Sequence, residues 1–277
     1  IKEAAVRALK EGFTHYTSSR GILELREAIS EDLKKRRIDA DPAREILVTP
    51  GTKHAIYCAC LSTLDPGDEV LVLSPTWPTH FQCIEMAGAR VVEVPCGENF
   101  SLDEEELKSR VTNKTKMILF SSPNNPTGGM LSDVEIKLIV DIAEDHDLLI
   151  LSDEIYDRIV YDDLQPLSPM AIENGRDRTI VVNGFSKAFA MTGWRLGYAC
   201  ACEEIIEFMA RIQQATTTCP VSFVQRAGIA ALKGPQEPIE EMVREYDKRR
   251  RFIYEKLSEI RGVRCTMPKG AFYIFPD

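Results

Sequence analysis

Residues 179–198 read TIVVNGFSKAFAMTGWRLGY, a short apolar run followed by a longer loop. The apolar run at 179–182 predicts a buried strand, because branched apolar side chains between turns suit the interior of a sheet. The loop that follows contains two cations, Lys187 and Arg195. The stretch therefore predicts a strand that delivers a lysine and an arginine to one end of a sheet.

Lys187 is the first candidate catalytic residue, because its neighbours Phe185, Ala188 and Phe189 are apolar. A poorly solvated ammonium group loses its proton more readily, and the neutral amine can attack a carbonyl to form a Schiff base. The planar guanidinium of Arg195 can bind a phosphate. A carbonyl-seeking lysine near a phosphate-binding arginine suggests pyridoxal 5'-phosphate (PLP). An ordinary surface lysine is the alternative that this stretch alone leaves open.

Composition narrows the class of protein. The chain has 277 residues, of which 44% are hydrophobic and 28% are charged, as in ordinary globular proteins. The net charge of −9 argues against a nucleic-acid surface, and no apolar run approaches the length of a membrane span. The eight cysteines and four histidines have no metal-ligand spacing, so we expect no metal and reduced thiols in a cytoplasmic protein.

Strand and helix patterns alternate through the middle of the chain. This alternation predicts an α/β fold, a doubly wound, mostly parallel seven-stranded sheet with helices on both faces. The predicted strands are 45–50, 69–73, 90–95, 116–120, 148–151, 179–182 and 196–200. The predicted helices are 1–11, 23–37, 51–64, 102–110, 133–146, 203–217, 222–232 and 237–259. Two more short strands are expected at 262–265 and 271–275.

Residues suited to ligand binding follow the ends of three predicted strands. Gly51, with Thr52 and Lys53 after it, opens a helix, and free N–H groups at a helix start bind anions. Trp77 is placed either to stack on a ring or to pack in the core. Asn125 is either a hydrogen-bond donor or an ordinary turn residue. Sheets of this kind bind ligands at these strand ends.

Asp153 is the second chemical centre. It stands at the end of the strand predicted at 148–151, in the sequence SDEIY. A buried carboxylate needs a partner, and pairing with the ring nitrogen of PLP would keep that nitrogen protonated. Tyr156, three residues later, can hydrogen-bond the cofactor's phenolate oxygen.

Taken together, these segments resemble the class I and II aminotransferases, the fold type I PLP enzymes related to aspartate aminotransferase. The resemblance extends over essentially the whole chain, and its most specific motifs are the Lys187 stretch, the NNPTG turn at 124–128 and the D-x-x-Y motif at 153–156. It implies that Lys187 forms the Schiff base and that Asp153 binds the ring nitrogen. It further implies that Asn125 and Tyr156 contact the phenolate oxygen.

The resemblance assigns further cofactor contacts. Arg195 and the turn formed by Gly51, Thr52 and Lys53 would bind the phosphate, and Trp77 would lie on the pyridine face. Some members have a serine where this chain has Gly184, so Ser186 serves instead or the contact is absent. Tyr16 would reach the phosphate of the partner subunit, which implies a homodimer with shared sites.

The activity implied is ping-pong transamination between an amino acid and a 2-oxo acid. Lys53 resembles a residue of aspartate aminotransferases that pairs with the distal carboxylate. We therefore expect aspartate or glutamate as donor and 2-oxoglutarate as acceptor, with Trp77 and Asn125 also near the substrate. Alternatives that stay open are an aromatic donor, a PLP-dependent lyase or synthase, a non-catalytic PLP-sensing domain and an inactive fragment.

The resemblance also predicts the domain organisation. Residues 1–240 would form the large PLP-binding domain, and residues 241–277 a linking helix and the beginning of a smaller α+β domain. The family's substrate-carboxylate arginine would lie beyond Asp277, and its closing N-terminal segment before Ile1. The chain is therefore expected to be truncated at both ends.

Overall fold

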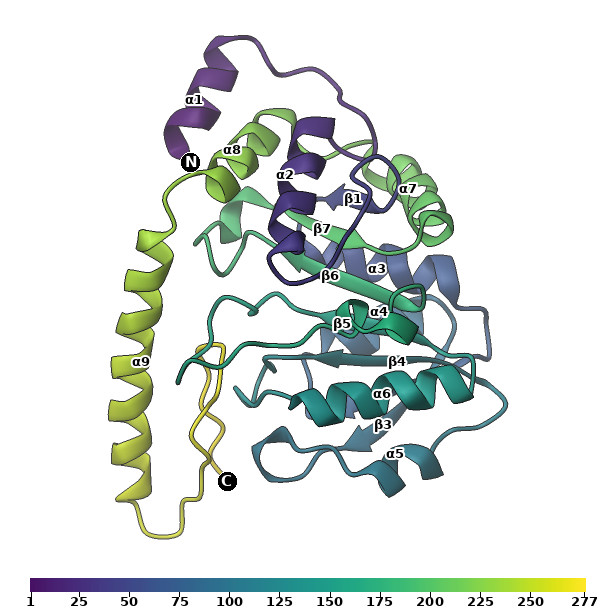
Figure 1. The fold of residues 1–277 in the computed structure, drawn as a ribbon, viewed down its shortest axis with the longest axis vertical. Helices are drawn as coiled ribbons and strands as arrows, with labels where there is room; N and C mark the ends of the chain where they lie inside the picture. Colours follow the sequence, from purple (N-terminus) through teal and green to yellow (C-terminus); the bar gives the residue numbers. More distant parts are fainter.

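The computed structural model describes residues 1–277, apart from the side chain of Asn99. Figure 1 shows a sheet covered by helices, with one long helix along its side. The strands are β1 (Ile46–Thr49), β2 (Glu69–Ser74), β3 (Arg90–Pro95), β4 (Thr115–Ser121), β5 (Leu149–Asp153), β6 (Thr179–Gly184) and β7 (Gly197–Cys200). The first helices are α1 (Lys2–Lys10), α2 (Leu23–Lys34), α3 (Thr52–Thr63), α4 (Thr79–Met86) and α5 (Glu104–Ser109). They are followed by α6 (Asp133–Asp145), α7 (Glu203–Thr217), α8 (Ser222–Lys233) and α9 (Glu237–Ser258).

The predicted seven-stranded sheet is confirmed, with strand order β1-β7-β6-β5-β4-β2-β3. The pairs among β2, β3, β4, β5 and β6 are parallel, and β7 runs antiparallel to both β1 and β6. The parallel strands end at one edge of the sheet. Polar residues that follow them therefore meet there, as the alternation in sequence predicts.

Helices cover both faces of the sheet, as expected. In β1, Leu47 packs with α3, α4 and α7 in one cluster, while its neighbours Ile46 and Val48 pack with α1, α2 and α8 on the other face. Toward the other edge, Leu71 and Leu73 of β2 pack with α5 and α6. Successive strand residues point to opposite faces, so an apolar run rather than an alternating one marks a sheet covered on both sides.

Three local predictions are wrong. The helix predicted at 23–37 ends at Lys34, because Arg37 adopts a left-handed conformation (φ 62°) and the Ile38 amide turns back to the carbonyl of Leu33. Residues 262–265 and 271–275 form no strand. Arg264 and Asp277 exchange two backbone hydrogen bonds, and Gly270 forms an isolated bridge with Val160. A ladder needs consecutive paired residues, and this segment has only isolated ones.

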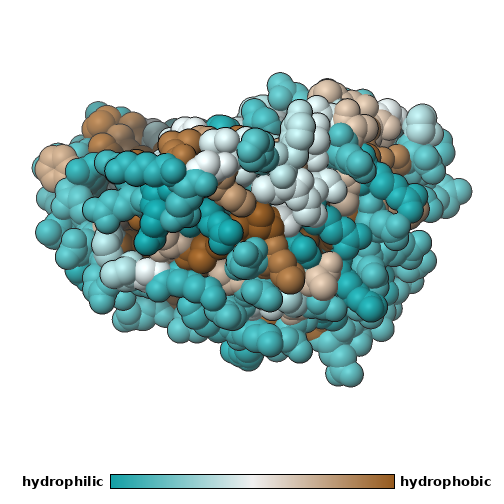
Figure 2. Space-filling model, turned by 90° about the horizontal axis from the view of Figure 1, so that it is seen from above, coloured by the Kyte–Doolittle hydropathy of each residue, from teal (hydrophilic) through white to brown (hydrophobic). Residues whose placement is uncertain are grey.

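The side formed by α1, α2, α7 and α8 is shown from above in Figure 2. Most of this surface is hydrophilic, with hydrophobic residues gathered near the middle of the view. Large hydrophobic side chains exposed on these helices are Val6, Leu9, Leu23 and Phe208. Among the described residues, no helix is long and apolar enough to cross a membrane.

Candidate active site

A cavity of about 260 Å³ opens where β5 and β6 end, and its lining comes from six separate segments of the chain. The sequence-predicted residues that line it are Thr52, Lys53, Trp77, Asn125, Asp153, Tyr156, Ser186, Lys187 and Arg195. Ile155, Thr192 and Tyr273 line it as well. Tyr16 is not among the lining residues and is 85% exposed. The fold therefore brings together all the predicted residues except Tyr16, with Gly51 directly behind the wall.

One end of the cavity is suited to an anion. Helix α3 begins at Thr52, so its first N–H groups lie at the lining without partners inside the helix. Gly51 has φ 86°, and a Cβ there would overlap the guanidinium of Arg195. Only glycine allows Arg195 to lie this close to the backbone at the start of α3. Ser186, also in the lining, adds a hydroxyl.

Arg195 itself has a left-handed backbone (φ 54°, ψ 58°), which a non-glycine residue adopts at some cost. Its Nη1 donates a hydrogen bond to the carbonyl oxygen of Thr192 at 2.9 Å. Arg195 is exposed as a whole and lines the cavity, so its charge is available to a phosphate. An unusual conformation at a lining residue is typical of functional sites.

Lys187 supplies the amine of the cavity. It is half-buried, and desolvation is the main cause that lowers its pKa. The charge of Asp153 acts in the opposite direction, and the charge of Arg195 lowers the pKa as well. Its Nζ lies 5.7 Å from the ring centroid of Tyr156 and 5.3 Å from that of Phe272. Aromatic faces attract the charged form, but burial dominates the shift. The amine is therefore more available as a nucleophile than that of a solvated lysine.

Asp153 is buried and lies deep in the cavity wall. Its Oδ1 accepts a hydrogen bond from the backbone N–H of Ile155 at 3.2 Å, and its Oδ2 lies 3.2 Å from Nε2 of His80. His80 was not predicted from the sequence as a site residue. A histidine three residues after Trp77 was a weak signal, because contact with Asp153 depends on how β2 and β5 are placed in the sheet.

Trp77 both packs in the core and lines the cavity, so the two interpretations of this residue are compatible. Its ring meets that of His80 edge to face, with the centroids 5.8 Å apart. The ammonium of Lys53 lies 4.9 Å from the Trp77 ring centroid. Lys53 is exposed, so its charge lies at the mouth of the cavity.

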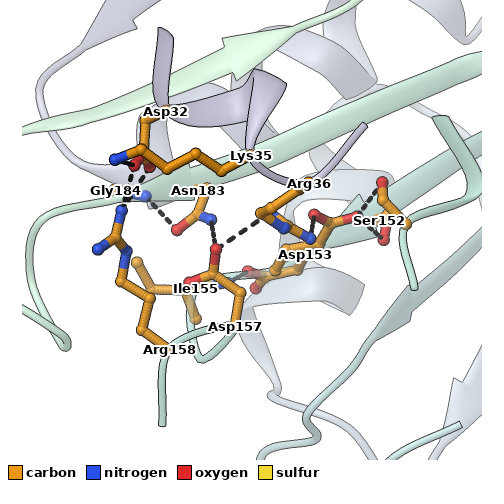
Figure 3. Close-up of polar contacts among 12 residues, drawn as sticks. Asp32, Lys35, Arg36, Ser152, Asp153, Ile155, Asp157, Arg158, Asn183 and Gly184 are labelled. Atoms are coloured by element: carbon orange, nitrogen blue, oxygen red, sulfur yellow. Dashed lines mark hydrogen bonds and ion pairs between the residues drawn. The ribbon is translucent and has the colours of Figure 1, made fainter. Parts of the chain in front are cut away.

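A buried charge network supports the end of β5 (Figure 3). Arg36, just after α2, donates to Glu154 at 2.6 Å and to Asp157 at 3.0 Å. Asp157 also accepts a hydrogen bond from the side chain of Asn183 at 3.0 Å, at the end of β6. The network thus ties the segment containing Asp153 to the segment leading to Lys187.

The network was not predicted from the sequence, although it left one signal. Glu154 and Asp157 stand beside Asp153, and several acidic residues at a buried strand end require cations nearby. Burial lowers the pKa of Arg36, but Glu154 and Asp157 outweigh this and hold it above its usual range. The arginine therefore stays charged and keeps the carboxylates in place.

These features fit PLP. The glycine-bounded helix start and Arg195 suit its phosphate, the buried carboxylate of Asp153 suits its ring nitrogen, and the amine of Lys187 suits its carbonyl. Among the described residues, no group of three or more histidine, cysteine, aspartate or glutamate side chains could hold a metal ion.

Comparison with known proteins agrees with this geometry. The family model "Aminotransferase class I and II" matches residues 1–277. The chain is 45% identical to aromatic-amino-acid aminotransferase 2 of Thermococcus litoralis and 45% identical to an aspartate aminotransferase of Pyrococcus abyssi. Each alignment covers 100% of this chain and 72% of the relative.

Solved structures give the same result. The structure of an aromatic aminotransferase from Pyrococcus horikoshii matches with a TM-score of 0.97 at 45% identity, over 99% of this chain and 74% of that one. The chain belongs to the class I and II aminotransferases. It is a PLP-dependent enzyme with the large-domain fold of that family, and its substrates are an amino acid and a 2-oxo acid.

Proposed function

We propose that the cavity around Lys187 is where this aminotransferase holds PLP and moves an amino group from an amino acid to a 2-oxo acid. The observation that carries the proposal is the amine of Lys187, with a lowered pKa, in one cavity with Asp153 and Arg195. PLP supplies a carbonyl that reacts with amines and a ring that withdraws electrons from the adjoining carbon.

Residues of this chain bind the cofactor and transfer the proton. Arg195 and the start of α3 hold the phosphate, and Asp153 keeps a proton on the ring nitrogen. At rest the amine of Lys187 would hold PLP at its carbonyl carbon, with the carbonyl oxygen leaving as water. Freed by a substrate amine, its Nζ would take the proton from the substrate Cα and deliver it to that carbon of the cofactor.

The test uses the chain loaded with PLP. Borohydride treatment followed by peptide mass spectrometry should find the cofactor on Lys187, and the Lys187→Ala variant should show no label. Aspartate should then change the visible absorbance of the unreduced protein and release its 2-oxo acid. Label on another lysine would overturn the assignment, and release of ammonia would favour the lyase alternative.

We propose aspartate or glutamate as the donor and 2-oxoglutarate as the acceptor. Lys53 supports this choice, because its ammonium lies at the cavity mouth over Trp77, where it can meet a distal carboxylate. An aromatic amino acid is the second candidate, since one relative at 45% identity is named for that activity. Trp77 and Asn125 would contact either donor.

A homodimer with shared sites is proposed on the exposure of Tyr16 and of the hydrophobic residues Val6 and Leu9. An aromatic side chain that is 85% exposed finds no support within its own subunit. Mixing Tyr16→Phe subunits with Lys187→Ala subunits should give hybrids in which one site is intact. Hybrids without any site of normal PLP affinity would contradict the arrangement.

Two further assignments belong to this proposal. We place the boundary of the large domain near residue 240, because α9 buries only Arg250 and packs through few residues. Limited proteolysis should cut first near the start of α9, and cleavage elsewhere would contradict the boundary.

The eight free cysteines suit a cytoplasmic location, which cell fractionation would test.

A further inference from the structure

The segment 268–273 brings a second phenol into the cavity. The hydroxyl oxygens of Tyr273 and Tyr156 lie 2.6 Å apart, and the two rings meet edge to face with centroids 5.7 Å apart. Tyr273 also lines the cavity that holds Lys187. The two tyrosines are 117 residues apart in the chain, so only the fold reveals that they meet.

The backbone around Tyr273 is firmly placed. The amides of Lys269 and Gly270 both donate to the carbonyl oxygen of Gly128, at 2.8 and 3.0 Å. The amide of Ala271 donates to the carbonyl oxygen of Ile159 at 2.8 Å. The segment is therefore held between the turn that carries Asn125 and the loop that follows Tyr156.

The segment 268–273 packs so closely against its neighbours that two positions require glycine. A Cβ on Gly128 would lie 2.6 Å from the Cβ of Pro268, and a Cβ on Gly270 would lie 2.5 Å from the Cγ of Pro123. No larger residue fits at either position without moving the segment. Ala271 is fully buried with φ 56°, a conformation that persists only where the surroundings enforce it.

The chemistry of the pair follows from the capacity of a phenol. A tyrosine hydroxyl has one proton to donate and two lone pairs to accept. Burial and the hydrogen bond with Tyr273 raise the pKa of Tyr156, and a hydrogen bond from the side chain of Asn125 lowers it. Tyr156 therefore stays protonated. If it donates to a ligand oxygen, its own oxygen remains free to accept the proton of Tyr273.

We infer that Tyr273 is a positioning residue that donates a hydrogen bond to Tyr156 and so strengthens the bond that Tyr156 donates to the phenolate oxygen of PLP. Hydrogen bonds in a chain polarise one another, and the low dielectric of a buried site increases the effect. This inference rests on the proposed function, which places PLP beside Tyr156.

The test is the pH dependence of the visible absorbance of the PLP-loaded chain. In Tyr273→Phe the negative charge of the PLP phenolate is less well stabilised. The nearby nitrogen that joins Lys187 to PLP therefore keeps its proton to higher pH. We expect the midpoint of the spectral change to rise by about half a pH unit, less than the effect of removing the Tyr156 hydroxyl itself. The double variant Tyr156→Phe/Tyr273→Phe should have the midpoint of Tyr156→Phe alone.

Tyr161→Phe is the matched control. The Tyr161 hydroxyl also anchors the same segment, but it donates its hydrogen bond to the carbonyl oxygen of Ala271 and not to Tyr156. It should reduce stability and leave the midpoint in place. Equal shifts in both variants, or additive shifts in the double variant, would show that Tyr273 only supports the segment and would overturn the inference.

The outcomes also separate this inference from the proposed function. A wild-type chain with no PLP bound to Lys187 would overturn both. A labelled Lys187 with an unmoved midpoint in Tyr273→Phe would overturn the inference alone. If a variant binds PLP too weakly for its absorbance to be titrated, urea unfolding of the PLP-free proteins tests whether the two tyrosines interact. The stability effects of Tyr156→Phe and Tyr273→Phe must then be non-additive, and strict additivity would overturn the contact.

Discussion

Nε2 of His80 lies 3.2 Å from Oδ2 of Asp153, and the His80 side chain is completely buried. Nδ1 of His80 lies 2.8 Å from the hydroxyl of Thr76, so both ring nitrogens have partners. The other oxygen of Asp153 is held by the backbone N–H of Ile155. The carboxylate cannot rotate without breaking one of its two bonds, and it is thereby preorganised for a positively charged ring nitrogen.

Replacing His80 by leucine should weaken PLP binding. The change removes one partner of a buried carboxylate, which costs about 1–3 kcal/mol and corresponds to a roughly fivefold to hundredfold loss of affinity. Fluorescence titration with PLP measures the effect. His146→Leu, at an exposed histidine after α6, should bind PLP as the wild type does. Unchanged affinity in His80→Leu would show that Asp153 does not depend on the imidazole.

The amine of Lys187 should react at lower pH than the solvated lysines. Desolvation lowers its pKa, so at any pH below the ordinary 10.5 a larger fraction is neutral and nucleophilic. Reductive labelling of the PLP-free chain with a small aldehyde and cyanoborohydride, followed by mass spectrometry, measures the midpoint. The exposed Lys53 provides the internal comparison.

Two variants should move that midpoint in opposite directions. Asp153 raises the pKa of Lys187, so Asp153→Asn should lower the midpoint. Arg195 lowers the pKa, so Arg195→Gln should raise it. Shifts of the same sign would mean that a change in burial, and not the charges, controls the amine.

Lys53→Ala should distinguish the donors. If the ammonium meets a distal carboxylate, kcat/KM for aspartate should fall by about tenfold to a hundredfold, and kcat/KM for phenylalanine should hardly change. Lys116→Ala, at an exposed residue of β4, is the control. Equal losses for both donors would place Lys53 on the phosphate.

Arg36→Met should destabilise the fold strongly. The change leaves Glu154 and Asp157 buried without their cation, which costs about 3–5 kcal/mol in the free energy of unfolding. Urea unfolding measures the loss. Arg44→Met breaks a surface pair with Glu203 at 3.3 Å and should change stability by less than about 1 kcal/mol. Similar losses in both variants would show that the buried network contributes no more than a surface pair.

Local sequence determined most of the elements. Strands such as β5 and β6 were predicted because a short apolar run between turns leaves few alternatives to a doubly covered strand. The start of α3 was predicted because Gly51 separates a strand pattern from a helix pattern. Local patterns were insufficient for α4, a helix of eight residues directly after Trp77, which the prediction omitted.

The C-terminal aromatic run does not form the strand that its sequence predicts. Residues 271–275 have the composition of a strand, but a strand also needs a neighbour along its length, and Gly270 finds only Val160. The segment is held instead by hydrogen bonds to Gly128 and Ile159. These contacts turn Tyr273 toward Tyr156.

For the site, the sequence by itself determined which residues stand at the strand ends, because each is marked within a few positions by a turn, a glycine or an apolar run. It also determined the family, through motifs such as the turn at 124–128. Tertiary structure alone decided the partners of these residues: His80 for Asp153, Arg36 for Glu154 and Asp157, and Tyr273 for Tyr156. Such contacts join segments far apart in the chain, and they depend on strand order and packing, which no local periodicity encodes.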